Sequence, residues 1–237
     1  MTRKAFREFE RRTIAGLAAL AGPRPGGPYD EQALPAYTNP NPLMRRVFWR
    51  RIRVAAGLIG RLPRARLAVD FGAGLGVMIP VLAGQAREVV AVEIEPAKLA
   101  AGTKSLGIAP GLFRVAASLG EAVGPAGPKA DIVLALDVLE HVPDLDTAVG
   151  AISRALDPRG RLIVSGPTET AAYRLGRRLA GYSGAYHHRG IREIERALAR
   201  RFRVVGRTAI YPLLPLFIVL EAVPDPAAPS SLNGGRT

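Results

Sequence analysis

From residue 67 onward, short apolar runs alternate with stretches of helical periodicity. The apolar runs are "LAVDF", "EVVAVEI", "GLFRVAA", "DIVLALD", "RLIVSG" and "FRVVGR". Helical spacing lies between them, at 76–86, 96–106, 144–156 and 190–201. Apolar runs of this length are typical of strands buried on both faces of a mainly parallel sheet. The alternation therefore predicts an α/β fold with a doubly wound sheet flanked by helices.

The first 62 residues precede this alternation and have a different pattern. A basic amphipathic helix is predicted over residues 1–20, and Glu8 and Glu10 argue against a cleaved export signal there. The stretch 22–42 is dense in proline and glycine and is interpreted as an irregular connector. A second helix is predicted from Met44 to Leu62. We expect an N-terminal helical and irregular cap over 1–62, an α/β domain over 63–222 and a disordered tail over 223–237.

Charge and composition limit the chemistry. The formal net charge is +13, which favours anionic partners or reflects a solvated basic surface, and the sequence leaves both open. Cysteine is absent, which excludes disulfides, thiolate metal sites and cysteine nucleophiles, and we expect no metal site. The run "AIYPLLPLFIVLEA" from Ala209 is too short for a bilayer span of about 20 residues and contains two prolines. We expect a cytoplasmic protein, with peripheral membrane contact left open.

Three glycines follow the first apolar run. Gly72, Gly74 and Gly76 stand where a parallel sheet places its ligand, beyond the carboxyl end of a strand. Glu93 ends the second run about 20 residues later, a position from which a carboxylate accepts hydrogen bonds from ribose hydroxyls. A nicotinamide dinucleotide would require Gly-x-Gly-x-x-Gly, and Val77 occupies that last position. The spacing disfavours a dinucleotide oxidoreductase.

Four ordered motifs carry a family resemblance that covers about residues 45–222. They are "AVDFGAGLG", "AVEIEP", "ADIVLALDVLEHVPDLDTAV" and "ALDPRGRLIVSGP". In these motifs the chain resembles the class I S-adenosylmethionine-dependent methyltransferases of small-molecule (type 11) kind. The resemblance implies a Rossmann-like sheet of seven strands and S-adenosylmethionine as cofactor. It assigns cofactor binding to Asp70, Gly72, Ala73, Gly74, Gly76, Glu93, Ile94, Asp137 and Val138, with Ser118 standing near the place of an aspartate that the family often carries after the third strand.

No compact catalytic motif is visible, because methyl transfer from a sulfonium relies mainly on positioning and exclusion of water. Candidate bases are His141, His187 and His188, since histidine accepts a proton near neutral pH. His141 lies in "LEHV", where a structural or cofactor-pocket role is the alternative. His187 and His188 close a long connection, 168–190, which we interpret as a lid insertion. Residues 170–190 are hypothesised to form, together with residues 29–50, a cap over the acceptor site.

The sequence thus predicts a methyltransferase that acts on a small-molecule or lipid-like acceptor, including an anionic or lipid-linked one. Nucleic acid is a less favoured partner, because the cysteine nucleophile of C5 methylation is absent and "LDVLEH" replaces the Asn/Asp-Pro-Pro-aromatic motif of base-amine methylation. Two further alternatives stay open. One is a non-catalytic nucleotide-binding protein. The other is peripheral membrane binding through residues 1–20 or "YRLGRRLAGY". Neither the methylated atom nor the oligomeric state is assigned.

Overall fold

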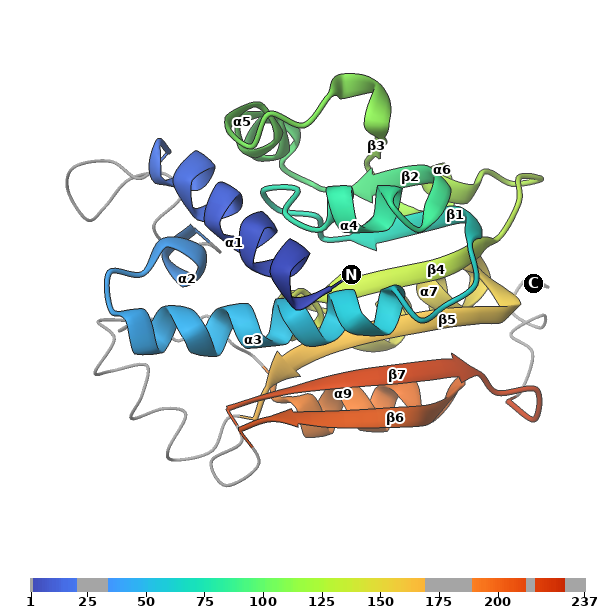
Figure 1. Cartoon of the computed structure of the whole chain (residues 1–237). Helices are drawn as coiled ribbons and strands as arrows, with labels where there is room; N and C mark the ends of the chain where they lie inside the picture. Colours follow the sequence, from blue (N-terminus) through green and yellow to red (C-terminus); the bar gives the residue numbers. More distant parts are fainter. Residues whose placement is uncertain (1, 21–33, 169–188, 212–215, 229–237) are drawn as a thin grey trace.

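The computed structural model describes residues 2–20, 34–168, 189–211 and 216–228. A sheet of seven strands in the order β3-β2-β1-β4-β5-β7-β6 forms its centre (Figure 1). The first five strands run parallel, and β7 is antiparallel to both β5 and β6. The doubly wound, mainly parallel sheet is therefore confirmed. The strands are β1 Ala65–Phe71, β2 Ala86–Val92, β3 Arg114–Ala116, β4 Ala130–Leu136, β5 Leu156–Pro167, β6 Phe202–Ile210 and β7 Phe217–Pro224.

Helices cover both faces of the sheet. One face carries α1 Arg3–Ala18, α3 Pro42–Ile59, α4 Ile79–Ala83 and α5 Pro96–Ser105. The other face carries α6 Leu119–Val123, α7 Leu145–Ala155 and α9 Ile191–Leu198. Two short 3₁₀ turns are also present, η1 Pro110–Leu112 and η2 Leu139–His141. A separate apolar core lies on each side of the sheet, because the central strands are buried on both faces.

The seventh strand is the element whose position the sequence did not indicate. The run from Ala209 contains the end of β6 and most of β7, whereas sequence analysis tested it only as a membrane segment. β7 also extends past residue 222 to Pro224, and the Asp225 N–H then donates to the carbonyl of Arg201. The first residues of the stretch 223–237, which was expected to be a disordered tail, are therefore structured. None of the helices in the described ranges is long and apolar enough to cross a bilayer.

The N-terminal helices share one aromatic cluster. The Trp49 ring of α3 lies 6.2 Å from Phe6 and 5.9 Å from Phe9, both in α1. Tyr37 completes the cluster at 5.8 Å from Trp49, and the Trp49 indole N–H donates to the Tyr37 carbonyl. The apolar side of the predicted basic helix is thus occupied inside the molecule.

Tyr37 belongs to a short helix, α2 Leu34–Thr38, within the stretch expected to be an irregular connector. That expectation is wrong for these five residues. The local sequence is rich in breakers, but burial of Leu34 and packing of Tyr37 on Trp49 stabilise the turn through tertiary contacts. Helix α3 then begins at Pro42, because the Asn41 side chain accepts the N–H groups of Leu43 and Met44.

Candidate cofactor site

The glycine turn folds back over the end of β2. Gly72, Gly74 and Gly76 have φ of 73°, 57° and 77°, a region that glycine adopts without strain. The Gly72 and Ala73 N–H groups both donate to the carbonyl of Val92. A Cβ on Gly72 would lie 2.7 Å from the Val138 Cβ, so the turn after β4 presses directly on this glycine. The predicted cofactor residues of these two turns, Ala73 and Val138 included, are therefore brought together.

Glu93 clamps the glycine turn to the end of β2. Its carboxylate accepts the Gly74 N–H at 2.7 Å and the Glu95 N–H at 3.0 Å, and the residue is 6% exposed. Each carboxylate oxygen accepts one of these bonds, so each keeps a lone pair that a hydroxyl donor can use. Ile94 follows immediately and is 85% exposed, which leaves an apolar surface beside the carboxylate. The pair offers polar and apolar contacts to one ligand.

Asp70 is the last buried residue of β1 before the turn. Burial is the larger cause, and the negative charge of Glu93 the smaller one, that raises the pKa of the Asp70 carboxyl from 3.8 to about 7. Near neutral pH the protonated and ionised forms of the Asp70 carboxyl are therefore both populated. A cation placed against Asp70 would favour the ionised form of its carboxyl. The electrostatics suit a ligand that carries positive charge.

Asp137 lies in a strained turn directly after β4. Its φ is 51°, a left-handed conformation that aspartate tolerates better than most side chains. The Ser165 hydroxyl donates to its carboxylate at 2.7 Å, and the Asp137 N–H donates to the Ser165 carbonyl. Strain held in place by several bonds is typical of a functional turn. The structure thus places Asp137 at the carboxyl edge of the sheet with its side chain fixed.

Two residues of this site were missed by sequence analysis. Arg51 of α3 pairs with Asp137, its Nε 2.5 Å from Oδ2, and its side chain is only 4% exposed. Arg51 also donates to the Tyr37 hydroxyl; burial raises the pKa of that hydroxyl to about 12, against the lowering effect of Arg51. The burial of Arg51 could have been predicted from the sequence, because this residue lies three positions after Phe48 and four before Ala55, on the apolar stripe of α3.

The remaining predicted residues lie farther out. Ser118 is exposed and caps α6 by accepting the Glu121 N–H at 3.2 Å, so its hydroxyl proton remains available as a donor. His141 is exposed in η2, four residues after Asp137, and its backbone N–H donates to the Val138 carbonyl. His187 and His188 lie outside the described residues, as does most of the predicted lid.

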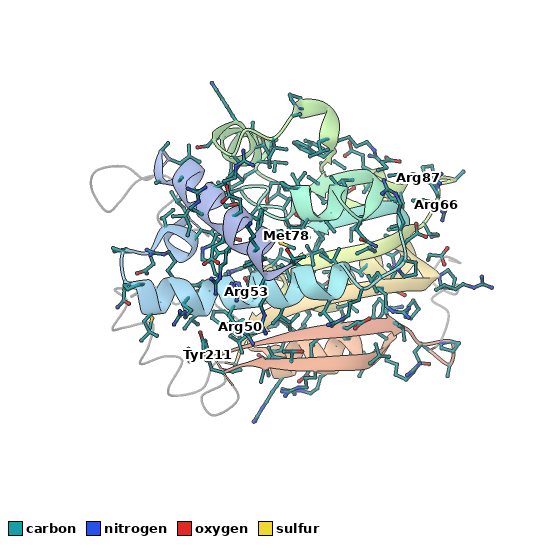
Figure 2. All side chains as sticks on the ribbon, viewed as in Figure 1. Arg50, Arg53, Arg66, Met78, Arg87 and Tyr211 are labelled. Atoms are coloured by element: carbon teal, nitrogen blue, oxygen red, sulfur yellow. The ribbon has the colours of Figure 1, made fainter. Side chains whose placement is uncertain are left out.

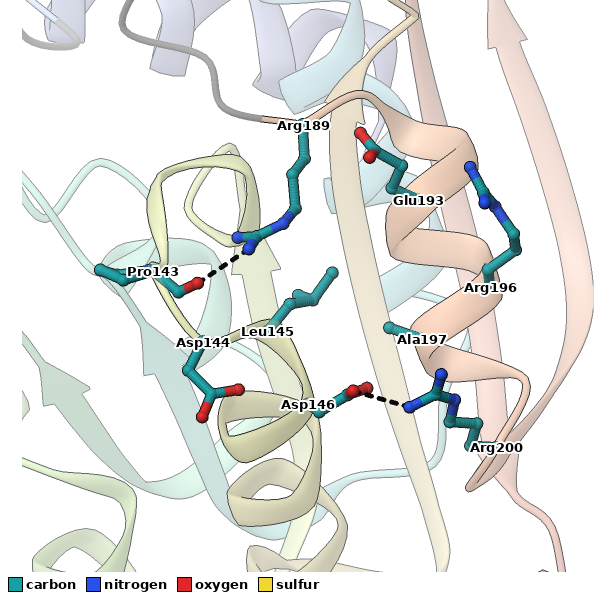
Figure 3. Close-up of a pocket in the computed structure, with 9 residues that line it drawn as sticks. All are labelled: Pro143, Asp144, Leu145, Asp146, Arg189, Glu193, Arg196, Ala197 and Arg200. Atoms are coloured by element: carbon teal, nitrogen blue, oxygen red, sulfur yellow. Dashed lines mark hydrogen bonds and ion pairs between the residues drawn. The ribbon is translucent and has the colours of Figure 1, made fainter.

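A separate hollow of about 370 Å³ lies between the start of α7 and one side of α9, from Arg189 before that helix to Arg200 after it (Figure 3). Its charged side chains are engaged locally: Arg189 donates to the Pro143 carbonyl, and Arg200 pairs with Asp146 at 2.6 Å. Asp144 caps α7, and the hydrogen bonds from Thr147 hold the pKa of its carboxyl below the usual value. We assign no ligand to this hollow, because its charged groups already bond to one another or to nearby backbone and hydroxyl groups.

Comparison with known proteins decides the family. The profile of a methyltransferase-domain family matches residues 44–209, more than half of the chain. The chain belongs to this family. The resemblance to class I S-adenosylmethionine-dependent methyltransferases is thereby confirmed. A relative from Brucella ovis, named ubiquinone biosynthesis O-methyltransferase, is 35% identical over 102 residues, which cover 41% of this chain and 39% of the relative. This methyltransferase domain thus spans well under half the length of the curated relatives that it matches.

Solved structures show the same fold at low identity. The N-methyltransferase NodS from Bradyrhizobium japonicum WM9, crystallised with S-adenosyl-L-homocysteine, has a TM-score of 0.61 and 15% identity, covering 91% of this chain and 99% of NodS. Magnesium protoporphyrin IX methyltransferase from Synechocystis PCC 6803, with the same bound product, has a TM-score of 0.57 and 19% identity, covering 78% and 88%. These likenesses support the Rossmann-like methyltransferase fold.

Proposed function

We propose that the chain binds S-adenosylmethionine between the glycine turn, Glu93 and the Asp137 turn, and that it methylates a small-molecule acceptor. The observation that carries this proposal is the clamp of Glu93 on the Gly74 N–H at 2.7 Å. It fixes a buried carboxylate at the tip of β2 with lone pairs left for two ribose hydroxyls. A purely structural clamp would not need the adjacent exposed Ile94. Family membership supports the same cofactor.

The glycine turn and the nearby carboxylates also suit the parts of S-adenosylmethionine other than its ribose. A Cβ built on Gly74 would lie 3.9 Å from the Gly72 carbonyl oxygen and from Lys98 Cε, both ordinary contact distances, so no neighbour presses tightly on the crest of the turn. The carboxylates of Asp70 and Glu93 are buried, whereas Asp137 pairs with the buried cation Arg51. The negative charge of Asp70 and Glu93 favours a ligand with net positive charge. S-adenosylmethionine, when bound, supplies a methyl group on a positively charged sulfur. The chain's own part is to position both reactants and to keep water out.

The proposed acceptor is a small molecule. The names of the relative from Brucella ovis and of the protein from Synechocystis point to small-molecule chemistry, ubiquinone biosynthesis in one and a magnesium porphyrin in the other. Among the described residues, Arg66 and Arg87 lie near the starts of their strands, away from Arg50 and Tyr211, so these arginines do not form one cluster (Figure 2). The acceptor is proposed to enter at the carboxyl edge of β4 and β5. Membrane contact and a lipid-linked acceptor remain part of the proposal to be tested.

Binding of S-adenosyl-L-homocysteine by calorimetry tests the proposal without an acceptor. The purified chain is expected to bind it, and Glu93→Ala is expected to weaken binding roughly 100-fold, about 3 kcal/mol for two hydrogen bonds to a charged group. Glu88→Ala is the matched control, because Glu88 stands on the same strand and pairs at the surface with Arg114. Its affinity should equal that of the parent. Absence of binding by the parent, or equal affinity of Glu93→Ala, would refute the site.

The acceptor itself is found by mass spectrometry. Small-molecule and lipid extracts are incubated with the chain and a donor whose methyl group carries a heavy isotope. A labelled product in one extract identifies the acceptor class. Labelling of RNA in a parallel incubation, lost as salt is raised, would instead favour the nucleic-acid alternative.

A further inference from the structure

Arg51 is the buried cation that links the N-terminal helices to the strand tips. It stands on α3, whereas its partner Asp137 follows β4, so the 2.5 Å pair bridges two layers of the fold. Its guanidinium carbon lies 5.0 Å from the Phe48 ring centre and 4.9 Å from that of Phe217. Rings on two elements and an ion pair leave this side chain little freedom. An arginine in such surroundings is fixed in one geometry.

The position that the Arg51–Asp137 ion pair gives to Asp137 also affects the glycine turn. Asp137 has φ of 51° and is followed at once by Val138, whose side chain lies against the Cα of Gly72. Moving Asp137 therefore moves the side chain on which the first glycine rests. Tyr37 of α2 joins the same network through its bond with Arg51. The contact path runs from α2 and α3, through Arg51 and Asp137, to the backbone proposed to hold the cofactor.

We propose that Arg51 is a positioning residue for the cofactor site, and that α3 is a wall of that site rather than only a cover over the sheet. Arg51 holds the turn at residues 137 and 138 against the glycine turn. The inference rests on the proposed function, because it concerns how well the chain holds S-adenosylmethionine or its product. It assigns a role to a residue outside all four sequence motifs.

A purely structural role makes a different prediction. Buried ion pairs often contribute little net stability, but removing one partner leaves the other charge uncompensated. If Arg51 served stability alone, its loss would lower the free energy of unfolding and leave the ligand affinity of the folded protein unchanged. A positioning role changes affinity as well, since misplacing a binding group by about 1 Å can cost up to 100-fold. Affinity measured on folded protein separates the two roles.

The experiment measures the Kd for S-adenosyl-L-homocysteine by calorimetry and the free energy of unfolding by urea titration. Arg51→Met is expected to raise the Kd at least about tenfold, and Arg51→Lys, which keeps the charge but not the planar fork, by a smaller factor. Arg50→Met is the matched control, because Arg50 is the exposed neighbour on the same helix, and its Kd should stay within about twofold of the parent. If Arg51→Met does not fold, Arg51→Lys decides the question.

A double variant tests the route through Asp137. If Arg51 acts by holding this carboxylate, Arg51→Met combined with Asp137→Asn should weaken binding no more than the stronger single change. Strictly additive losses would overturn the inference, as would a Kd within twofold of the parent for Arg51→Lys and for every folded Arg51→Met sample. A parent that fails to bind overturns the proposed function and this inference together, whereas a binding parent with unchanged Arg51 variants overturns this inference alone.

Discussion

Replacing Asp70 with asparagine should make the protein more stable at neutral and higher pH. The folded pKa of Asp70 is about 7, compared with an ordinary value of 3.8. Between these values the folded state keeps a proton that the unfolded state releases, so stability falls as pH rises from about 4 to 7. At about 1.36 kcal/mol for each pH unit, the full cost is about 4 kcal/mol above pH 7. An asparagine side chain cannot ionise, so the variant escapes this cost.

Urea unfolding of both proteins at several pH values measures the effect. The stability of Asp70→Asn minus that of the parent should increase by about 3 kcal/mol between pH 5 and pH 8. Other titrating groups largely cancel in the difference. Asp146→Asn is the surface control, because Asp146 is 60% exposed and pairs with Arg200 at the surface. A flat profile for Asp70→Asn would refute the burial argument for this carboxyl.

Two further substitutions test the packing around the site. Gly76→Ala should lower the free energy of unfolding by roughly 2–4 kcal/mol, because φ is 77° and the new methyl would lie 2.7 Å from Thr103 Cγ2. Gly57→Ala is the control: its methyl would lie in open space on α3, so the variant should be neutral or stabilising in the same urea titration. Trp49→Phe should cost about 1–2 kcal/mol in thermal or urea unfolding, because the Tyr37 carbonyl loses its indole donor; an unchanged stability would contradict this role.

The parts of the site that the sequence predicted are those coded within a few residues of one strand end. The glycine turn and Glu93 follow strands β1 and β2, and parallel pairing of these strands brings their carboxyl ends together. The strands themselves were predictable because burial on both faces requires continuous apolar runs. β7 was not predicted because the apolar run that contains it was considered only as a membrane span, which its short length and Pro212 and Pro215 argued against.

Arg51 and Tyr37 escaped for a different reason. Their role depends on partners far away in the chain, since Arg51 pairs with Asp137 and lies against Phe217. Helical periodicity places Arg51 on the apolar stripe of α3, but periodicity alone does not predict which acidic residue pairs with it. α2 likewise forms from a sequence rich in breakers, because its stability comes from Trp49. Long-range pairing of this kind is visible only in the fold.

The two long N-terminal helices should differ in what they contribute. Phe6 of α1 is buried against Phe9 and Trp49, and α1 also rests on α5, where the Ser105 hydroxyl donates to the Gly16 carbonyl. α3, by contrast, contacts the Asp137 turn directly through Arg51. Phe6→Ala is therefore expected to cost about 3–5 kcal/mol of stability.

The same variant should leave the Kd for S-adenosyl-L-homocysteine within about twofold of the parent, when binding is measured at a temperature where both proteins are folded. Stability lost with affinity kept would divide the predicted cap over residues 1–62 into a supporting helix, α1, and a site-forming helix, α3. A tenfold weaker affinity in folded Phe6→Ala would show that α1 reaches the site through Trp49 and Tyr37. The division between the two helices would then have to be abandoned.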